Sequence, residues 1–346
     1  MTRHTVFIAH DYPLEDQLDQ VAQALRDQGV EVIRGPRTAP GAKLVYPPER
    51  YDELFGRAEV MMFSSRSICS RDVIRAAPRL SGIVNPTIGL ETVDLAAASE
   101  LGIIVGHGAQ PENYLGMAEA TVMFMLMLMY NPKASQEVTY GIRPRPNPRE
   151  VWAQMLLGRT VGLVGLGRIA HAVVERLAGF NVKLIAYDPF VPPDSVPANV
   201  ELTQDLDTLL RRSDIVGLFI AVTPETRNMI NDRTLALMKP TAFLVNPSRG
   251  DAVDEDALYR ALKEKRIAGA ALDVFQVEPP PPDSPLLTLD NVILTPHMIG
   301  QTKDSFAAIT KVAVENVRRI LNREPPLYCK NPAVIPAWRE RLAHMG

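Results

Sequence analysis

The stretch TVGLVGLGRIAHAVVERLAGFNVKLIAYDP, residues 160–189, contains a strand, a turn, a helix and a second strand in order. Its two ends are short apolar runs, typical of strands that are buried on both faces. Between them, Gly165, Gly167 and Ala170 have the spacing of the fingerprint Gly-x-Gly-x-x-Gly/Ala that opens a helix in dinucleotide-binding folds. This order predicts a β-α-β unit of a parallel sheet, with an anion-binding turn at the helix N-terminus.

Three residues of this segment suit a bound NAD. Gly165 would allow the tight turn, and Gly167 would let the backbone approach a pyrophosphate. Asp188 ends the second strand, where a carboxylate can accept hydrogen bonds from ribose hydroxyls. Because Asp188 would repel a 2′-phosphate, the sequence favours NAD(H) over NADP(H). The alternative is a close-packed strand-to-helix turn in which Asp188 is only the residue before Pro189.

The alternation of strand and helix continues on both sides of this segment. Apolar runs typical of strands lie at residues 5–9, 30–33, 60–63, 80–84 and 102–106, and again at 214–220, 242–246, 269–275 and 291–295. Gly29, Gly102 and Gly179 stand at helix-to-strand junctions, where a residue at positive φ is expected to end each helix. We therefore predict an α/β fold with two Rossmann-like or flavodoxin-like parallel-sheet domains separated by a cleft.

Two segments between these series have a character of their own. Residues 113–129 predict an apolar, buried helix whose five Met side chains fill gaps in a core. A role in binding a soft metal is the weaker alternative, because no His or Cys accompanies them. Residues 130–150 are rich in Pro and charge and predict a long surface connection.

The composition excludes several classes of protein. The chain has 346 residues, 46% of them hydrophobic and 22% charged, with a net charge of −3, which is ordinary for a globular protein and unsuited to binding nucleic acid. Cys69 and Cys329 are far apart, so neither a disulfide framework nor a metal site is expected. No run reaches the roughly 18 apolar residues of a membrane span, and the N-terminus lacks a signal peptide. We expect a cytoplasmic protein without a membrane partner.

Arg249, Glu278 and His297 each come a few residues after a separate predicted strand. The carboxyl ends of parallel strands meet at one edge, where open α/β sheets bind ligands, so we expect these side chains to share a site. A His can protonate a carbonyl oxygen as a hydride arrives, and a neighbouring carboxylate would fix its tautomer and raise its pKa. A guanidinium matches a substrate carboxylate. A lone His after a strand is more often structural, but the Glu and the Arg favour catalysis.

Five ordered motifs, GLGRIA, YDP, NPSRGDAVDEDAL, ALDVFQVEP and TPHMIG, make the chain similar to the D-isomer-specific 2-hydroxyacid dehydrogenase family over nearly its whole length. The resemblance implies NAD(H)-dependent, reversible reduction of a 2-oxo acid to a D-2-hydroxy acid. It implies that His297 and Glu278 form a proton relay and that Arg249 orients the substrate. Glu278 argues against a formate dehydrogenase, because those relatives have Gln beside the His.

The resemblance also implies a division of the chain and a set of cofactor contacts. A substrate-binding domain would comprise residues 1–105 and 300–346, and residues 106–299 would form the NAD-binding domain. A homodimer is implied, with the helix after the first hinge in the contact. The residues implied to contact the cofactor are Gly165, Gly167, Arg168, Ile169, Asp188, Pro247, Ser248, Asp273 and Gly300.

The family's substrate loop corresponds here to TIGLETVD, residues 87–94. The resemblance implies that Ile88 and Gly89 bind the substrate carboxylate through their N–H groups, together with Arg249 and His297. Thr87 replaces the first Gly of the family pattern, and Asn85 stands where an Arg is frequent. A stiffer loop and a less cationic site follow, which disfavours a phosphorylated substrate. Without the resemblance, a plain strand-to-helix turn is the simpler interpretation.

Two other functions remain open at this point. The same fold serves as an NAD-sensing corepressor in which dimerisation and a peptide groove matter more than turnover. Phosphite oxidation within the same family also uses an Arg, a Glu and a His. The residues do not identify the substrate side chain.

Overall fold

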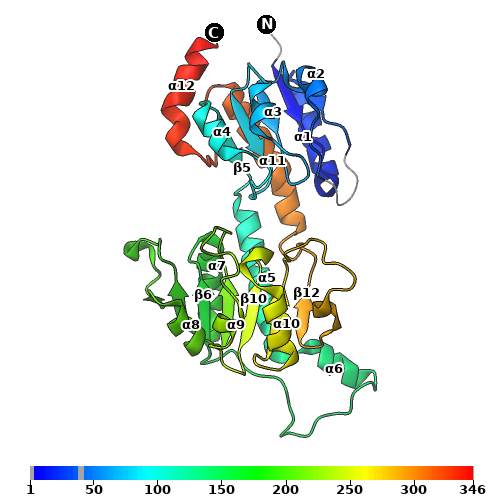
Figure 1. The fold of residues 1–346 in the computed structure, drawn as a ribbon, viewed down its shortest axis with the longest axis vertical. Helices are drawn as coiled ribbons and strands as arrows, with labels where there is room; N and C mark the ends of the chain where they lie inside the picture. Colours follow the sequence, from blue (N-terminus) through cyan, green and yellow to red (C-terminus); the bar gives the residue numbers. More distant parts are fainter. Residues whose placement is uncertain (1–3, 38–42, 346) are drawn as a thin grey trace. The chain divides into compact units, whose positions relative to one another are not determined.

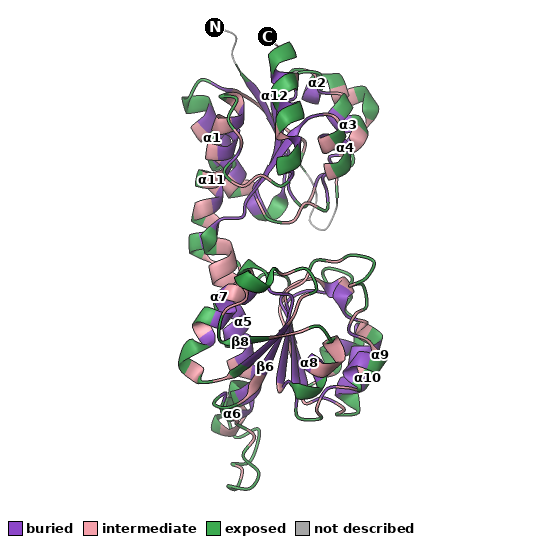
Figure 2. Ribbon diagram, turned by 90° about the vertical axis from the view of Figure 1, so that its left-hand side faces the viewer, coloured by how far each residue is buried: buried purple, intermediate pink, exposed green. Residues whose placement is uncertain are grey.

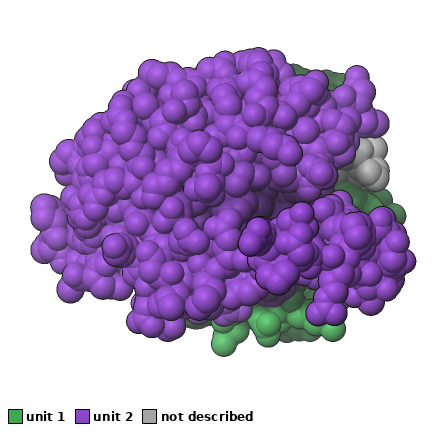
Figure 3. Space-filling model, turned by 90° about the horizontal axis from the view of Figure 1, so that it is seen from below, with its two compact units in different colours: residues 1–112, 303–346 green, residues 113–302 purple. Residues whose placement is uncertain are grey.

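The computed structural model describes residues 4–37 and 43–345, which form two compact units (Figures 1 and 3). Unit 1 comprises residues 1–112 and 303–346, and unit 2 comprises residues 113–302. The expected boundaries, before residues 106 and 300, lie a few residues too early in the chain. Gly106 belongs to a strand of unit 1, where it pairs with Val84. A Cβ atom at Gly300 would lie 2.7 Å from the sulfur of Met117, so Gly300 adjoins the first helix of unit 2.

Unit 1 is built on a five-stranded parallel sheet. Apolar residues fill β1, β3, β4 and β5, which are buried along their length, as strands covered on both faces require. The strand order β2-β1-β3-β4-β5 is that of the flavodoxin-like fold, which places the expected ligand edge at β1 and β3. The strands are β1 (Thr5–Ile8), β2 (Glu31–Arg34), β3 (Val60–Met62), β4 (Gly82–Asn85) and β5 (Ile104–His107).

Helices cover both faces of this sheet. α1, α11 and α12 pack on one face, and α2, α3 and α4 pack on the other. In α1, Leu18, Val21 and Leu25 recur at helical spacing and are fully buried, which stabilises the fold by about 1.5–3 kcal/mol for each side chain. The helices are α1 (Glu15–Asp27), α2 (Tyr51–Phe55), α3 (Arg71–Arg75), α4 (Leu95–Glu100), α11 (Lys303–Leu321) and α12 (Ile335–His344).

Unit 2 contains a seven-stranded parallel sheet of order β12-β11-β10-β9-β6-β7-β8. The order reverses beside β6, as in the Rossmann fold. β8 was not predicted from the sequence, because it is an edge strand with only Val200 buried. The strands are β6 (Thr160–Val164), β7 (Lys183–Tyr187), β8 (Val200–Thr203), β9 (Ile215–Leu218), β10 (Phe243–Asn246), β11 (Gly269–Leu272) and β12 (Val292–Leu294).

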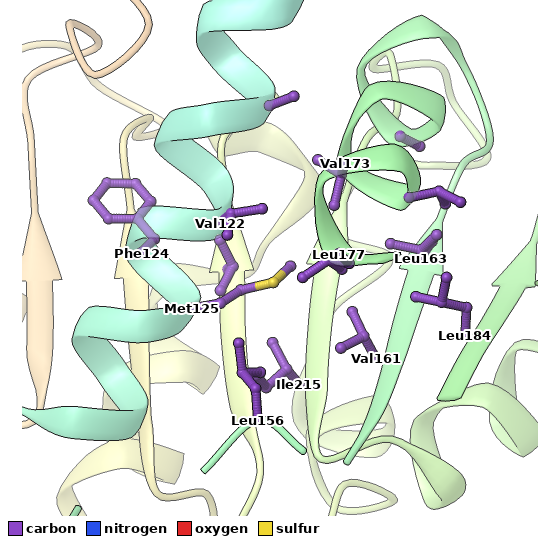
Figure 4. Packing of buried hydrophobic residues seen from close by; sticks show 14 of the residues in the cluster. Val122, Phe124, Met125, Leu156, Val161, Leu163, Val173, Leu177, Leu184 and Ile215 are labelled. Carbon is purple, nitrogen blue, oxygen red and sulfur yellow. The ribbon is translucent and has the colours of Figure 1, made fainter. Parts of the chain in front are cut away.

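The helices of unit 2 enclose its sheet from both sides, so that most of its strands are buried (Figure 2). Val122 and Met125 of α5 meet Val173 and Leu177 of α7 above β6, as Figure 4 shows. α8, α9 and α10 pack on the opposite face. The helices are α5 (Pro111–Tyr130), α6 (Pro132–Thr139), α7 (Arg168–Leu177), α8 (Leu206–Arg212), α9 (Asp232–Leu235) and α10 (Glu255–Lys263).

Three local predictions need correction. Met125 and Met129 fill the core as expected, but Met123 is 40% exposed, so one side of α5 is open. The predicted surface connection contains α6, which begins after Asn131 caps its N-terminus. After α7, the residue at positive φ is Asn181 rather than Gly179, because Asn also tolerates the left-handed conformation. In the described residues, no helix is long and apolar enough to cross a membrane.

Candidate active site

The two glycines of the turn after β6 differ in their surroundings. Gly165 has a φ of +90°, and a Cβ atom there would lie 2.6 Å from the carbonyl oxygen of Phe219, so no other residue fits. A Cβ atom at Gly167 would meet nothing within 4 Å. Gly167 therefore faces open space at the point where α7 begins, and no side chain caps this helix end. An anion such as a pyrophosphate suits the N–H groups at such a terminus.

Asp188 lies beside this turn at the end of β7. One of its carboxylate oxygens accepts a hydrogen bond from the N–H of Leu166 at 2.9 Å, and the other accepts from the N–H of Phe190 at 2.9 Å. Asp188 is therefore the turn residue of the alternative interpretation. It also holds the glycine-rich turn in place. Each oxygen has capacity for a further hydrogen bond, so the expected ribose contact is compatible with this arrangement.

Arg249 stands in a tight turn after β10 that Asn246 organises. The buried Oδ1 of Asn246 accepts hydrogen bonds from the N–H and the hydroxyl of Ser248, at 3.1 and 2.8 Å, and its Nδ2 donates to the carbonyl of Arg249 at 2.9 Å. Pro247 is buried within the turn. Asn246 was missed from the sequence, although Asn two residues before Ser is a known turn-forming pattern.

The turn of Arg249 is backed by the segment that leads to Glu278. A Cβ atom at Gly250 would lie 1.9 Å from the carbonyl carbon of Phe275, so the two backbones are in direct contact. The N–H of Phe275 in turn donates a hydrogen bond to Oε1 of Glu278 at 3.1 Å. The loops after β10 and β11 are thus held as one body.

Glu278 and His297 are in direct contact, as the sequence predicted. Oε2 of Glu278 lies 2.8 Å from Nδ1 of His297. His297 has a φ of 56°, and its own N–H donates to the carbonyl of Asp273. The side chains of His297 and Glu278 remain 47% and 36% exposed, so the pair is open to a small molecule. With Nδ1 engaged, Nε2 of His297 is the nitrogen left for a reacting group.

The electrostatics of this pair favour a charged imidazole. The hydrogen bond from Glu278, and its charge, raise the pKa of His297 against the opposing effects of burial and of Arg249. Burial alone would raise the pKa of Glu278, but the hydrogen bond and charge of His297 outweigh it and lower that pKa. The positive charge of Arg249 lowers the pKa of both groups.

Asp273 links the histidine loop to β11. Its Oδ1 accepts hydrogen bonds from the hydroxyl of Thr295 at 2.6 Å and from the N–H groups of Met298 and Ile299 at 2.9 and 3.1 Å. One oxygen of Asp273 therefore caps this turn, which is the alternative to a role in cofactor binding. Oδ2 is buried and has no partner in the described part of the chain. An unpaired buried acceptor is costly, and an N–H donor from a bound cofactor would satisfy it.

The other predicted cofactor residues lie close to these features. Arg168 is exposed at the first position of α7, while Ile169 packs its side chain against the core beneath that helix. Ser248 and Pro247 belong to the turn of Arg249, and Gly300 ends the loop that Asp273 braces. The residues described include no cluster of His, Cys, Asp or Glu that could hold a metal ion.

The predicted substrate loop lies at the carboxyl edge of β4 in unit 1. Oδ1 of Asn85 accepts from the N–H and the hydroxyl of Thr87, both at 2.8 Å, and its Nδ2 donates to the carbonyl of Gly89 at 2.7 Å. Asn85 therefore braces the loop at both ends. Among the described residues, no group accepts a hydrogen bond from the N–H of Ile88 or from the N–H of Gly89. Backbone N–H groups without an acceptor can bind an anion.

The chain is similar to known proteins over most of its length. Residues 121–299 match the family model of the D-isomer-specific 2-hydroxyacid dehydrogenase NAD-binding domain. The chain is 40% identical over 269 residues to D-3-phosphoglycerate dehydrogenase of Methanocaldococcus jannaschii, a match that covers 77% of this chain and only 50% of that protein.

Two further relatives match over more of their length. Glyoxylate reductase of Thermofilum pendens is 40% identical over 270 residues, which is 76% of this chain and 78% of that enzyme. The crystal structure of a 2-hydroxyacid dehydrogenase from Ketogulonicigenium vulgare has a TM-score of 0.80 at 26% identity, and the match covers 95% of this chain and 98% of that one.

Proposed function

Because the chain belongs to the D-isomer-specific 2-hydroxyacid dehydrogenase family, we propose that it reduces a 2-oxo acid reversibly to a D-2-hydroxy acid with NADH. The observation that carries this proposal is the hydrogen bond between Glu278 and His297, with Arg249 close enough to affect the pKa of both. An acid, a base that charges it and a cation are the groups that carbonyl reduction needs.

In the proposed reaction, NAD(H) supplies or accepts the hydride, and the protein manages the proton and the substrate charge. Nε2 of His297 donates a proton to the carbonyl oxygen as the hydride reaches the carbon, which gives the hydroxyl group. Glu278 accepts the hydrogen bond from Nδ1 and stabilises the charged imidazole. Arg249 binds the substrate carboxylate and polarises the carbonyl. In the oxidation direction, neutral His297 takes the proton back.

Three features of unit 2 support NAD as the cofactor. Gly167 leaves open space at the start of α7 for a pyrophosphate. Asp188 ends β7 with acceptor capacity for ribose hydroxyls, and its charge disfavours a 2′-phosphate. The unpaired Oδ2 of Asp273 suits the carboxamide N–H of the nicotinamide. Of the substrate groups, the carboxylate is the ligand that the N–H groups of Ile88 and Gly89 fit.

The test is oxidation of NADH and of NADPH by a panel of 2-oxo acids: glyoxylate, hydroxypyruvate, pyruvate, and branched and aromatic oxo acids. We expect NADH-dependent turnover of at least one of them, and a loss of about 10²–10⁴-fold in kcat/KM in His297→Ala. Near-wild-type turnover in that variant would show that His297 is not the acid. Tight NADH binding without turnover, together with capture of peptides, would favour the NAD-sensing alternative. NAD reduction by phosphite alone would favour phosphite oxidation.

We also propose that the protein is a homodimer in which α5 contributes to the contact. One side of α5 lines an open, mostly apolar groove of about 610 Å³. Met123 and Tyr130 are 40% and 46% exposed there, and an exposed apolar patch can mark a contact with another protein chain. Residues of this groove are Val122, Met123, Leu126, Met127, Tyr130 and Arg176.

Light scattering after size-exclusion chromatography tests the dimer. We expect a mass near twice the 38.2 kDa of one chain, and a fall to the mass of one chain in Met123→Glu. Val45→Glu is the matched control, because Val45 is 70% exposed and lies in unit 1, outside the groove. A wild-type protein with the mass of a single chain would contradict the proposal.

A further inference from the structure

A second carboxylate, Glu255, holds the loop that carries Glu278. Oε1 of Glu255 accepts a hydrogen bond from the N–H of Gln276 at 2.6 Å. The side chain of Gln276 fastens the same loop to the segment before α10, because its Nε2 donates to the carbonyl of Val253 at 2.8 Å. One residue earlier, the N–H of Phe275 donates to Glu278 itself. Glu255 and Glu278 therefore accept hydrogen bonds from the N–H groups of two adjacent residues, Gln276 and Phe275.

Glu255 is not needed to begin the helix on which it stands. It is the first residue of α10, and Asp254 before it already caps the helix by accepting from the N–H of Ala257 at 3.0 Å. A residue at this position is usually a solvated side chain on the helix end. Glu255 instead turns its carboxylate to the loop after β11, where it is partly buried. Its contact thus connects α10 to the loop of Glu278.

The charges around Glu255 form one group with the proposed relay. Burial raises the pKa of Glu255, and the negative charges of Asp256, Asp251 and Glu278 raise it further, against the N–H of Gln276. Asp251 is itself paired with Arg227 at 3.0 Å. The charges that act on the pKa of His297 are those of Glu278, Arg249 and Asp273. The two carboxylates accept hydrogen bonds from the N–H groups of adjacent residues, Gln276 and Phe275, which holds Glu255 near Glu278 and so near the proposed relay.

We propose that Glu255 is a positioning residue for the proton relay: it holds Gln276 so that Glu278 faces His297, and its negative charge favours the protonated imidazole. This inference rests on the proposed function for its role in turnover. The two effects can be separated by substitution. Glu255→Gln keeps a carbonyl oxygen that can accept from Gln276 but removes the charge, whereas Glu255→Ala removes both.

The matched control is Asp256→Asn. Asp256 is the next residue of α10 and carries the same charge at the same helix end, but it is exposed and no hydrogen bond joins it to the loop of Glu278. A general loss of negative charge near α10 would affect both variants equally. An effect through Gln276 and Glu278 would be confined to Glu255.

The first measurement is the NMR titration of His297 in the full-length protein, with its signal identified among the six histidines by comparison with His297→Asn. We expect the pKa of His297 to fall by about 0.5 to 1 pH unit in Glu255→Gln and by much less in Asp256→Asn. An unchanged pKa in Glu255→Gln would overturn the electrostatic role. This readout needs no substrate, so it stands even if no 2-oxo acid is reduced and the proposed function fails.

The second measurement is the pH profile of 2-oxo acid reduction. Above the pKa of His297, reduction by Glu255→Gln should fall about 3- to 10-fold below that of the wild type, because less imidazole is protonated. Glu255→Ala should also lower kcat at pH values where His297 is fully charged, since the loop is no longer held. A uniform loss at every pH in all three variants, accompanied by lower melting temperatures, would show a structural role only and would overturn the proposal.

Discussion

Two turns of the same pattern, Asn-Pro-Ser/Thr-x-Gly, occupy corresponding places in the two sheets. Residues 85–89 begin with the last residue of β4, and residues 246–250 begin with the last residue of β10. Each of these strands is separated from the first strand of its sheet by one other strand. In each turn, the Asn side chain accepts from the N–H and the hydroxyl of the residue two positions later. The Asn and the hydroxyl residue are therefore a shared frame.

The turns differ in what the frame presents. The fourth residue is Ile88 in unit 1 and Arg249 in unit 2. In unit 1 the donors on offer are backbone N–H groups, and in unit 2 the donor is a guanidinium that acts on Glu278 and His297. Each turn is packed against the loop after the neighbouring strand: Gly250 lies against Phe275 in unit 2, and a Cβ atom at Gly108 in unit 1 would lie 2.1 Å from the carbonyl oxygen of Pro86. In the proposed function, one local structure thus serves backbone recognition of an anion in one sheet and side-chain chemistry in the other.

The largest expected effect concerns the fourth residue of each turn, Arg249 in unit 2 and Ile88 in unit 1. Arg249→Ala should lower kcat/KM for 2-oxo acid reduction by about 10³-fold, because a charged donor to the reacting group is lost. Ile88→Ala should change it by less than about 3-fold, since the N–H group is retained. Steady-state kinetics on the same substrate compare the two. Arg249→Lys should recover only part of the activity, because Lys cannot form a forked contact. Similar losses in both Ala variants would break the comparison.

The next effect concerns the shared frame. Asn246→Ala should lower kcat, because Arg249 loses its support. Asn85→Ala should raise KM, because the proposed anion-binding loop loosens. We expect a change of about 10- to 100-fold in each case. Each change also leaves buried polar groups unpaired, which costs about 1–3 kcal/mol of stability. Thermal melting and separate kcat and KM values test this.

A third asparagine provides the control for the frame. Asn291 comes directly before β12, at the opposite end of the strands. Its Nδ2 donates hydrogen bonds to two backbone carbonyls, at 3.2 and 3.3 Å. Asn291→Ala should therefore lower the melting temperature without changing kcat or KM. If its kinetic effect matched that of Asn246→Ala, loss of stability alone would explain both.

The smallest expected effect is a shift in the pH dependence of the rate. A change at the site in unit 2 should cause it, and a change in the turn of unit 1 should not. Reduction needs protonated His297, whose pKa is raised by the hydrogen bond and charge of Glu278, so its rate should fall as pH rises through that raised pKa. Oxidation needs the neutral ring and should rise over the same interval. Glu278→Gln should move both transitions to lower pH, whereas Asn85→Ala should leave them in place. An unshifted profile in Glu278→Gln would contradict the relay.

Short-range patterns in the sequence were enough to predict much of this protein. Strands buried on both faces must be apolar, a positive φ beside another backbone requires Gly165, and a carboxylate at a strand end is visible as Asp188. The contact between Glu278 and His297 was predictable because the carboxyl ends of parallel strands share an edge. These inferences depend on local geometry and on one general rule of sheet topology.

Other features depend on contacts that the chain makes only once folded. The roles of Asn246 and Glu255 follow from which backbone groups come within hydrogen-bonding distance of them, and identical residue types elsewhere are ordinary surface or turn residues. β8 was missed because an edge strand lacks the apolar signature of a covered one. The tertiary structure alone decides these points, because a hydrogen bond between distant segments leaves no periodic or local mark in the sequence.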